Sequence, residues 1–149
     1  MAPRFIGRFE HSLDVKGRVI LPARYRSDLG PQAYLSQWKD GCLALWTPEE
    51  FAKQSDEQEQ RQELGRKERQ LARVFASMAI AVDIDRQGRV AIPAYLRDFA
   101  HLEVERPLLV TGALNRVELW NPAEWDRRVK PTEAQLTDED SDPAAPEPS

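Results

Sequence analysis

Two segments of the chain place an aspartate four residues before an arginine, with a glycine between them. DVKGRVILPARYR begins at Asp14 and DRQGRVAIPAYLR begins at Asp85, and seven of their thirteen positions are identical. The two carboxylates can pair with the guanidinium groups of Arg18 and Arg89, so each arginine would lose less rotamer entropy on meeting a ligand. A guanidinium held on a rigid hairpin suits bidentate hydrogen bonding to guanine O6 and N7 in the major groove of DNA.

Each segment predicts a tight hairpin that carries two cations. Gly17 and Gly88 permit the positive φ that short hairpin loops commonly require, and the aspartates can accept hydrogen bonds from amides of the turn. The first loop adds Lys16 and the second adds Arg86, and neither is needed for a core. The candidate DNA-contacting residues are Asp14, Lys16, Arg18, Asp85, Arg86 and Arg89. The alternative is a purely structural hairpin whose Asp–Arg pair only ties the loop.

The duplication extends beyond the hairpins. LALWTPEEF, from Leu43, matches VELWNPAEW, from Val117, and in both a Thr or Asn N-cap precedes a proline at the first helical position. Alternating apolar residues before each hairpin indicate a half-buried strand. A repeat of about 45 residues is too small to bury a core alone. We therefore predict an α+β fold in which the two halves complete one β-barrel with pseudo-twofold symmetry.

Residues 8–50 and 79–122 are predicted to be the two repeated domains. Residues 51–78 predict one long polar linker helix, weakened in its middle by Gly65, whose apolar stripe docks on the barrel. The stripe consists of Leu64, Leu71, Val74, Phe75 and Met78. Residues 131–149 are rich in Pro, Asp, Glu and Ala, and they predict a disordered acidic tail.

The net charge of −4 conceals a basic region. The chain has six acids and no bases from Glu133 onward, whereas residues 1–30 contain six bases and three acids. Phosphate backbones respond to the local field, so a nucleic-acid partner is compatible with this composition. No apolar run approaches the roughly 20 residues that span a membrane, no signal-peptide pattern is present, and the single cysteine excludes an internal disulfide. We expect a soluble cytoplasmic protein.

Other residues that could do chemistry lack partners at useful spacing. His11 and His101 have no metal-ligand neighbours, and Cys42 is interpreted as a buried thiol. Asp83 alternates with Asp85 on one strand, but the repeat explains the position of Asp85 better than an acid–base pair does. The four tryptophans are interpreted as core anchors rather than base-stacking platforms, and no Gly-rich phosphate loop is present. We predict no catalytic residue, no metal and no cofactor.

The doubled motif is similar to that of a known family. D-x-K-G-R-x-x-L-P-x-R-Y-R followed by D-x-x-G-R-x-x-I-P-x-x-L-R, with both W-x-P elements, resembles the MraZ family of bacterial regulators of the division and cell-wall gene cluster. The resemblance runs from about Phe5 to Trp125. It implies two SpoVT-AbrB-type domains in a swapped-hairpin barrel, and a ring of subunits that represses its own operon by binding short direct repeats. The motif positions of the family are here Asp14, Arg18, Asp85 and Arg89, whereas Lys16 and Arg86 are added from charge.

We therefore predict a sequence-specific, DNA-binding transcriptional regulator, nucleoid-associated, with double-stranded DNA and copies of itself as partners and no membrane or small-molecule substrate. One bidentate contact is worth about 1–3 kcal/mol, so linked subunits on repeated DNA boxes are required, and the linker helix is one candidate surface for assembly. Gln87 stands where the first loop has Lys16, so we expect the first hairpin to be the stronger contact. The alternatives are a β-barrel enzyme or small-molecule-binding barrel, and an antitoxin-like module that binds a protein through the acidic tail.

Overall fold

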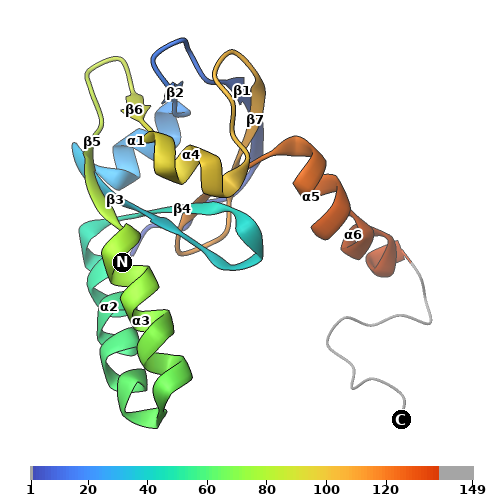
Figure 1. Ribbon diagram of the computed structural model, residues 1–149. Coiled ribbons are helices and arrows are strands. Elements are labelled where there is room, and N and C mark those ends of the chain that lie inside the picture. Colours follow the sequence, from blue (N-terminus) through green and yellow to red (C-terminus); the bar gives the residue numbers. More distant parts are fainter. Residues whose placement is uncertain (1, 138–149) are drawn as a thin grey trace.

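The computed structural model describes residues 2–137, and these residues repeat one order of elements (Figure 1). The first half contains β1 (Arg8–Ser12), β2 (Arg18–Ile20), α1 (Ala23–Leu29), β3 (Gln32–Gln37), the 3-10 turn η1 (Lys39–Gly41), β4 (Leu43–Trp46) and α2 (Pro48–Arg61). A second 3-10 turn, η2 (Gln62–Leu64), and α3 (Arg66–Met78) lead to the second half. That half contains β5 (Ile80–Asp83), β6 (Arg89–Ala91), α4 (Ala94–Ala100), β7 (Pro107–Gly112), β8 (Val117–Trp120), α5 (Pro122–Arg128) and α6 (Lys130–Thr137). The α+β class is confirmed.

The two halves interlock through their strand pairing. A six-stranded antiparallel sheet has the order β1-β7-β8-β4-β3-β5, and β2 pairs with β6 in a separate two-stranded ladder. The first strand of each half therefore pairs with a strand of the other half, as the prediction that the halves complete one another requires. The prediction of a closed barrel is wrong, because β1 and β5 form opposite edges of the described sheet. The β2–β6 ladder, α1 and α4 contribute the apolar residues that cover the remaining side of the core.

The core contains side chains from both halves. Across the central β4–β8 pair, Leu43 lies opposite Leu119, and both are fully buried. Burying one such leucine stabilises the fold by about 1.5–3 kcal/mol. Trp46 and Trp120 are buried as predicted, whereas the other two tryptophans are partly exposed. Cys42 is also buried, and its burial raises the thiol pKa far above its ordinary value.

Both predicted helix starts are present. The Thr47 hydroxyl accepts a hydrogen bond from the Glu50 amide at 3.1 Å at the start of α2. The Asn121 side chain accepts from the amides of Ala123 and Glu124, at 2.8 and 3.1 Å, at the start of α5. Each cap satisfies amide donors that have no partner within the first helical turn.

The linker between the halves is a pair of antiparallel helices and not the single long helix that the sequence predicts. Gly65 adopts φ +150°, which other residues rarely tolerate, and the chain reverses there between α2 and α3 (Figure 1). Phe75 is 8% exposed and stacks on Phe51, but Leu71 is 53% exposed, so most of the predicted stripe does not dock on the body. None of the helices in residues 2–137 has the length and apolar character needed to cross a membrane.

The first seven residues of the predicted disordered tail are helical. Residues 131–137 are helical, because they belong to α6. Pro131 lies in the first turn of this helix, where a residue without an N–H is tolerated, and Glu133 lies 3.6 Å from the guanidinium of Arg8. The remainder of the predicted tail, residues 138–149, lies outside the described residues.

Candidate nucleic-acid interface

The first hairpin is closed by Asp14. The Gly17 amide donates to the Asp14 carbonyl at 3.0 Å, and Gly17 has the positive φ, +76°, that the sequence predicts. The Asp14 Oδ1 atom accepts from the amides of Lys16 and Arg18, both at 2.9 Å. Its Oδ2 atom accepts from Nε of Arg18 at 2.8 Å. The carboxylate therefore closes the turn and orients the arginine at the same time.

The second hairpin has the same geometry. Oδ1 of Asp85 accepts from the amides of Gln87 and Arg89 at 2.9 Å, and Oδ2 accepts from Nε of Arg89 at 2.7 Å. Gly88 has φ +81°. The predicted Asp–Arg pairing is thus present in both hairpins, and so is the structural role that the alternative assigns to it.

Each of the two arginine side chains is hydrogen-bonded through its Nε atom alone within residues 2–137. Nε is bonded to the aspartate, while the terminal nitrogens of Arg18 and Arg89 have no hydrogen-bond partner within residues 2–137. The backbone amide of Arg18, followed by its side chain and the Lys16 amide, lowers the pKa of Asp14 below its ordinary value, and Arg89 does the same for Asp85. At neutral pH both carboxylates are therefore ionised, and each guanidinium keeps two NH₂ groups available to a ligand.

The β2–β6 ladder places both arginines on one face. Val19 lies opposite Val90 in the register, and both side chains are buried in the core. Side chains alternate along a strand, so the neighbours of these valines point away from the core. Arg18 and Arg89 are such neighbours, lying diagonally across the ladder beside the exposed Ile20. The loops that carry them lie at the end of the molecule opposite the α2–α3 pair (Figure 1).

The two remaining predicted cations lie at the loop tips. Lys16 and Arg86 are exposed, and neither takes part in an ion pair within residues 2–137. The ladder therefore brings all six predicted residues to neighbouring loops at one end of the molecule.

Two further arginines at this face were not singled out from the sequence. Arg26 of α1 covers Gly88, and Arg97 of α4 covers Gly17, so each hairpin meets an arginine from the other half. Both glycines are buried as a result. The available signal was that the thirteenth residue of the repeated segment is arginine in both copies.

Comparison with known proteins identifies the family. The family model described as "MraZ protein, putative antitoxin-like" matches twice, over residues 5–74 and 75–144. The chain belongs to the MraZ family. It is 35% identical over 134 residues to the "Transcriptional regulator MraZ" of Pediococcus pentosaceus, and the aligned region covers 90% of this chain and 92% of that protein. It is 36% identical over 132 residues to the protein of the same name from Desulforamulus reducens, with coverage of 89% and 92%.

A solved structure is more distantly similar. The solution structure of PHS018 from Pyrococcus horikoshii gives a TM-score of 0.34 at 14% identity, covering 79% of this chain and 96% of that one.

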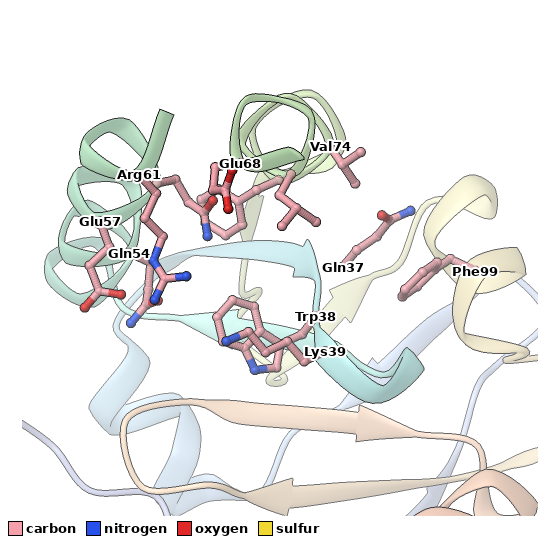
Figure 2. A pocket seen from close by; sticks show the side chains of 12 residues that line it. Gln37, Trp38, Lys39, Gln54, Glu57, Arg61, Glu68, Val74 and Phe99 are labelled. Carbon is pink, nitrogen blue, oxygen red and sulfur yellow. The ribbon is translucent and has the colours of Figure 1, made fainter. Parts of the chain in front are cut away.

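Away from the ladder, side chains surround a hollow. Figure 2 shows it between α2, α3 and the Trp38 and Phe99 side chains. Its volume is about 300 Å³, and its lining mixes apolar residues of α3 with polar residues of α2. No residue of either hairpin lines it, and residues 2–137 contain no group of three His, Cys, Asp or Glu side chains that could hold a metal ion. The hollow and the arginine face are separate surfaces.

Proposed function

We propose that this MraZ protein is a sequence-specific DNA-binding transcriptional regulator that contacts base edges with Arg18 and Arg89. The observation that carries the proposal is that both arginines lie on one outward face, each held at Nε by its own aspartate. The names of the relatives support it. The free NH₂ groups match guanine O6 and N7, and the loop-tip cations Lys16 and Arg86 supply phosphate contacts.

Several subunits are needed for a specific site. Two bidentate contacts at about 1–3 kcal/mol each supply about 2–6 kcal/mol, which reaches only the lower part of the roughly 4–10 kcal/mol that separates specific from non-specific sites. When subunits are joined, each later contact is intramolecular and the contributions accumulate on one DNA molecule. A ring of subunits on short direct repeats satisfies this requirement, and occupancy of such repeats in the promoter of its own division and cell-wall operon would repress it. The protein would then act in the cytoplasm, at the nucleoid.

A ring requires two different surfaces on each subunit. The two edges of the sheet each carry exposed apolar side chains. The set at the β5 edge and the neighbouring α3 comprises Leu71, Val74, Met78 and Ile80, and the set at the β1 edge comprises Ile6, Phe9 and Leu114. Val74 and its neighbours on α3 also line the hollow of Figure 2. We propose that the β5 edge of one copy docks on the β1 edge of the next.

The assembly surface has its own test. Leu71→Asp with Val74→Asp is expected to lower the mass of the assembly measured by light scattering, because charges would enter an apolar contact. Val15→Asp is the control, since Val15 is also an exposed apolar residue but lies in the turn of the first hairpin and belongs to neither set. An unchanged mass in the double variant would reject this surface and leave the DNA proposal standing.

DNA binding is tested by selecting sequences from a random double-stranded pool and measuring affinity for the selected fragment. Arg18→Ala with Arg89→Ala is expected to weaken binding at least about 30-fold, from the loss of two bidentate contacts, with the fold and assembly unchanged. The control, Lys53→Ala with Arg61→Ala, removes the same charge from exposed positions on α2. Wild-type affinity in the Arg18/Arg89 variant would contradict the proposal.

The antitoxin-like description of the family favours a second candidate, a module that binds a protein partner through the acidic tail. Removal of residues 138–149 discriminates between the two. A DNA-binding protein keeps or gains affinity for DNA when acidic residues are removed, whereas a tail-dependent module loses its protein partner.

A further inference from the structure

Each hairpin glycine is covered by an arginine of the other half. A Cβ atom placed on Gly88 would lie 2.6 Å from both Cδ and Nε of Arg26, and one placed on Gly17 would lie 3.1 Å from Cζ of Arg97. Contacts this short mean that the arginine side chains rest directly on the glycine backbone. The space that a side chain would need is therefore occupied by a guanidinium from the opposite repeat.

The strand pairing explains how these arginines reach the opposite hairpin. The Leu21 amide donates to the Gly88 carbonyl, and the Ile92 amide donates to the Gly17 carbonyl, both at 2.9 Å. Each strand thus ends beside the other hairpin, and the next residue is the proline that starts α1 or α4. The arginine is the fourth residue of its helix in both cases, one turn beyond this junction. The arrangement is reciprocal and obeys the pseudo-twofold symmetry.

The charge of these arginines is uncompensated. Nε of Arg26 and Nε of Arg97 are both inaccessible to solvent and have no hydrogen-bond partner, and neither guanidinium has an ion pair within residues 2–137. An unpaired desolvated donor costs free energy. Each hairpin consequently carries three cations and one carboxylate: Lys16, Arg18 and Arg97 with Asp14, and Arg86, Arg89 and Arg26 with Asp85.

We propose that Arg26 and Arg97 are positioning residues that hold the hairpin of the opposite half in its DNA-contacting geometry. The planar guanidinium of Arg26 covers Gly88 and fixes the turn in which Asp85 orients Arg89, and Arg97 does the same for the turn of Arg18. Each half of the chain therefore controls the contact made by the other half. The effect on DNA affinity rests on the proposed DNA-binding function, whereas the positioning of the turns by Arg26 and Arg97 does not.

The geometry is tested without DNA by amide hydrogen exchange on the full chain. Arg26→Ala is expected to accelerate exchange about tenfold at Gln87, Gly88 and Arg89, because local opening becomes easier when the cover is removed. The amides of Lys16 and Arg18, in the hairpin of the same half, are expected to be unchanged. Equal protection at residues 87–89 in wild type and variant, or acceleration at residues 16–18 instead, would overturn the proposal.

The consequence is tested by a double-mutant cycle on the selected DNA fragment. Arg26→Ala is expected to weaken binding about five- to twentyfold. The same change should have less than about a twofold effect in an Arg89→Ala background, since the residue it positions is gone, but its full effect in an Arg18→Ala background. Equal effects in the two backgrounds would overturn the proposal, because they would mean that Arg26 acts only as a charge.

A conservative variant separates positioning from charge. Arg26→Lys keeps the charge but not the planar group, so we expect it to bind the selected fragment as weakly as Arg26→Ala, with the wild-type slope of log affinity against log salt. Full rescue by lysine would overturn the proposal. If the wild-type protein selects no DNA at all, the proposed function fails, and the exchange experiment alone decides whether the arginines position the hairpins.

Discussion

Glu118 offers a test of how the two halves are joined at the centre of the sheet. It lies on β8 opposite Ala44 of β4, and its side chain is 10% exposed. Oε1 accepts from the Trp120 indole N–H at 2.9 Å, and Oε2 accepts from Nε of Arg116 at 2.8 Å. The Arg116 guanidinium in turn lies 5.4 Å from the ring centre of Trp38, in the first half. Glu118→Ala removes the acceptor of both donors.

The expected loss follows from these contacts. A buried indole N–H left without an acceptor costs about 1–3 kcal/mol. Breaking a fully buried ion pair costs about 3–5 kcal/mol, but the Arg116 side chain is 24% exposed, and water recovers part of that cost. We therefore expect the free energy of unfolding to fall by about 2–4 kcal/mol. In a chain of this size such a loss lowers Tm by about 4–16 °C.

Thermal and urea unfolding of the full chain measure the effect. Glu103→Ala is the matched control, because its pair with Arg106 spans 3.9 Å between side chains that are 77% and 73% exposed. Exposed pairs contribute about 0–1 kcal/mol. Glu118→Gln keeps an acceptor oxygen for Trp120 and should lose less than the alanine variant, and it serves if the alanine variant does not fold.

Arg116 and Glu118 are also expected to be energetically coupled. Since the two side chains act as one unit, Arg116→Ala should cost less in a Glu118→Ala background than in the wild-type chain, by about 0.5–3 kcal/mol. A Tm loss no larger than that of Glu103→Ala, or strictly additive losses in the cycle, would refute the account of this cluster.

Two more predictions concern the hairpins. The pKa values of Asp14 and Asp85 are lowered, so their contribution to folding stability is complete above about pH 4 and is lost as the pH falls through the folded-state pKa. Titration of the carboxyl groups followed by NMR should give midpoints below the ordinary value of 3.8. The midpoint of Asp14 should stay below 3.8 in Arg18→Ala, because the largest cause of its lowered pKa is the hydrogen bond from the backbone amide of residue 18, which the substitution keeps. Gly88→Ala should destabilise the chain more than Gly41→Ala. Both glycines have positive φ, but a Cβ on Gly88 would lie 2.6 Å from Arg26, whereas a Cβ on Gly41 would meet nothing within 4 Å. Equal decreases in the free energy of unfolding, measured in urea, would contradict the packing of Arg26 on Gly88.

The repeated segments were sufficient to predict the tight turn of each hairpin and the completion of one half by the other. Gly17, Asp14 and Arg18 carry local information, since a turn with an aspartate at its entry and a glycine at its end forms from contacts within five residues. The helix starts at Thr47 and Asn121 are local in the same sense. The structure confirms each of these features.

What the sequence left open depends on contacts between distant residues. Gly65 within a polar segment is compatible with a kinked helix or with a reversal, and only the packing of Phe75 on Phe51 and Trp38 favours the reversal. A closed barrel would require β1 to pair with β5, and no residue type in the sequence predicts whether these two strands pair. Arg26 could be recognised as repeated, but its position over Gly88 follows from the pairing of β2 with β6. In that pairing Val19 lies opposite Val90, which is 71 residues later in the chain.

The sequence and the cross-packing of the arginines together bear on how the two hairpins compare. From the sequence, Lys16 in the first loop and Gln87 at the matching place suggest that the first hairpin is the stronger contact. The loops nevertheless carry equal charge, because Arg86 in the second loop balances Lys16 in the first. Arg97 and Arg26 from the opposite halves add one cation to each hairpin and keep the charges equal, so charge gives no reason for a difference. What remains is the kind of cation at the tip, a lysine point charge in one and an arginine fork in the other. A lysine suits a phosphate and an arginine also suits a base edge, so any inequality between the hairpins should appear in sequence preference rather than in salt dependence.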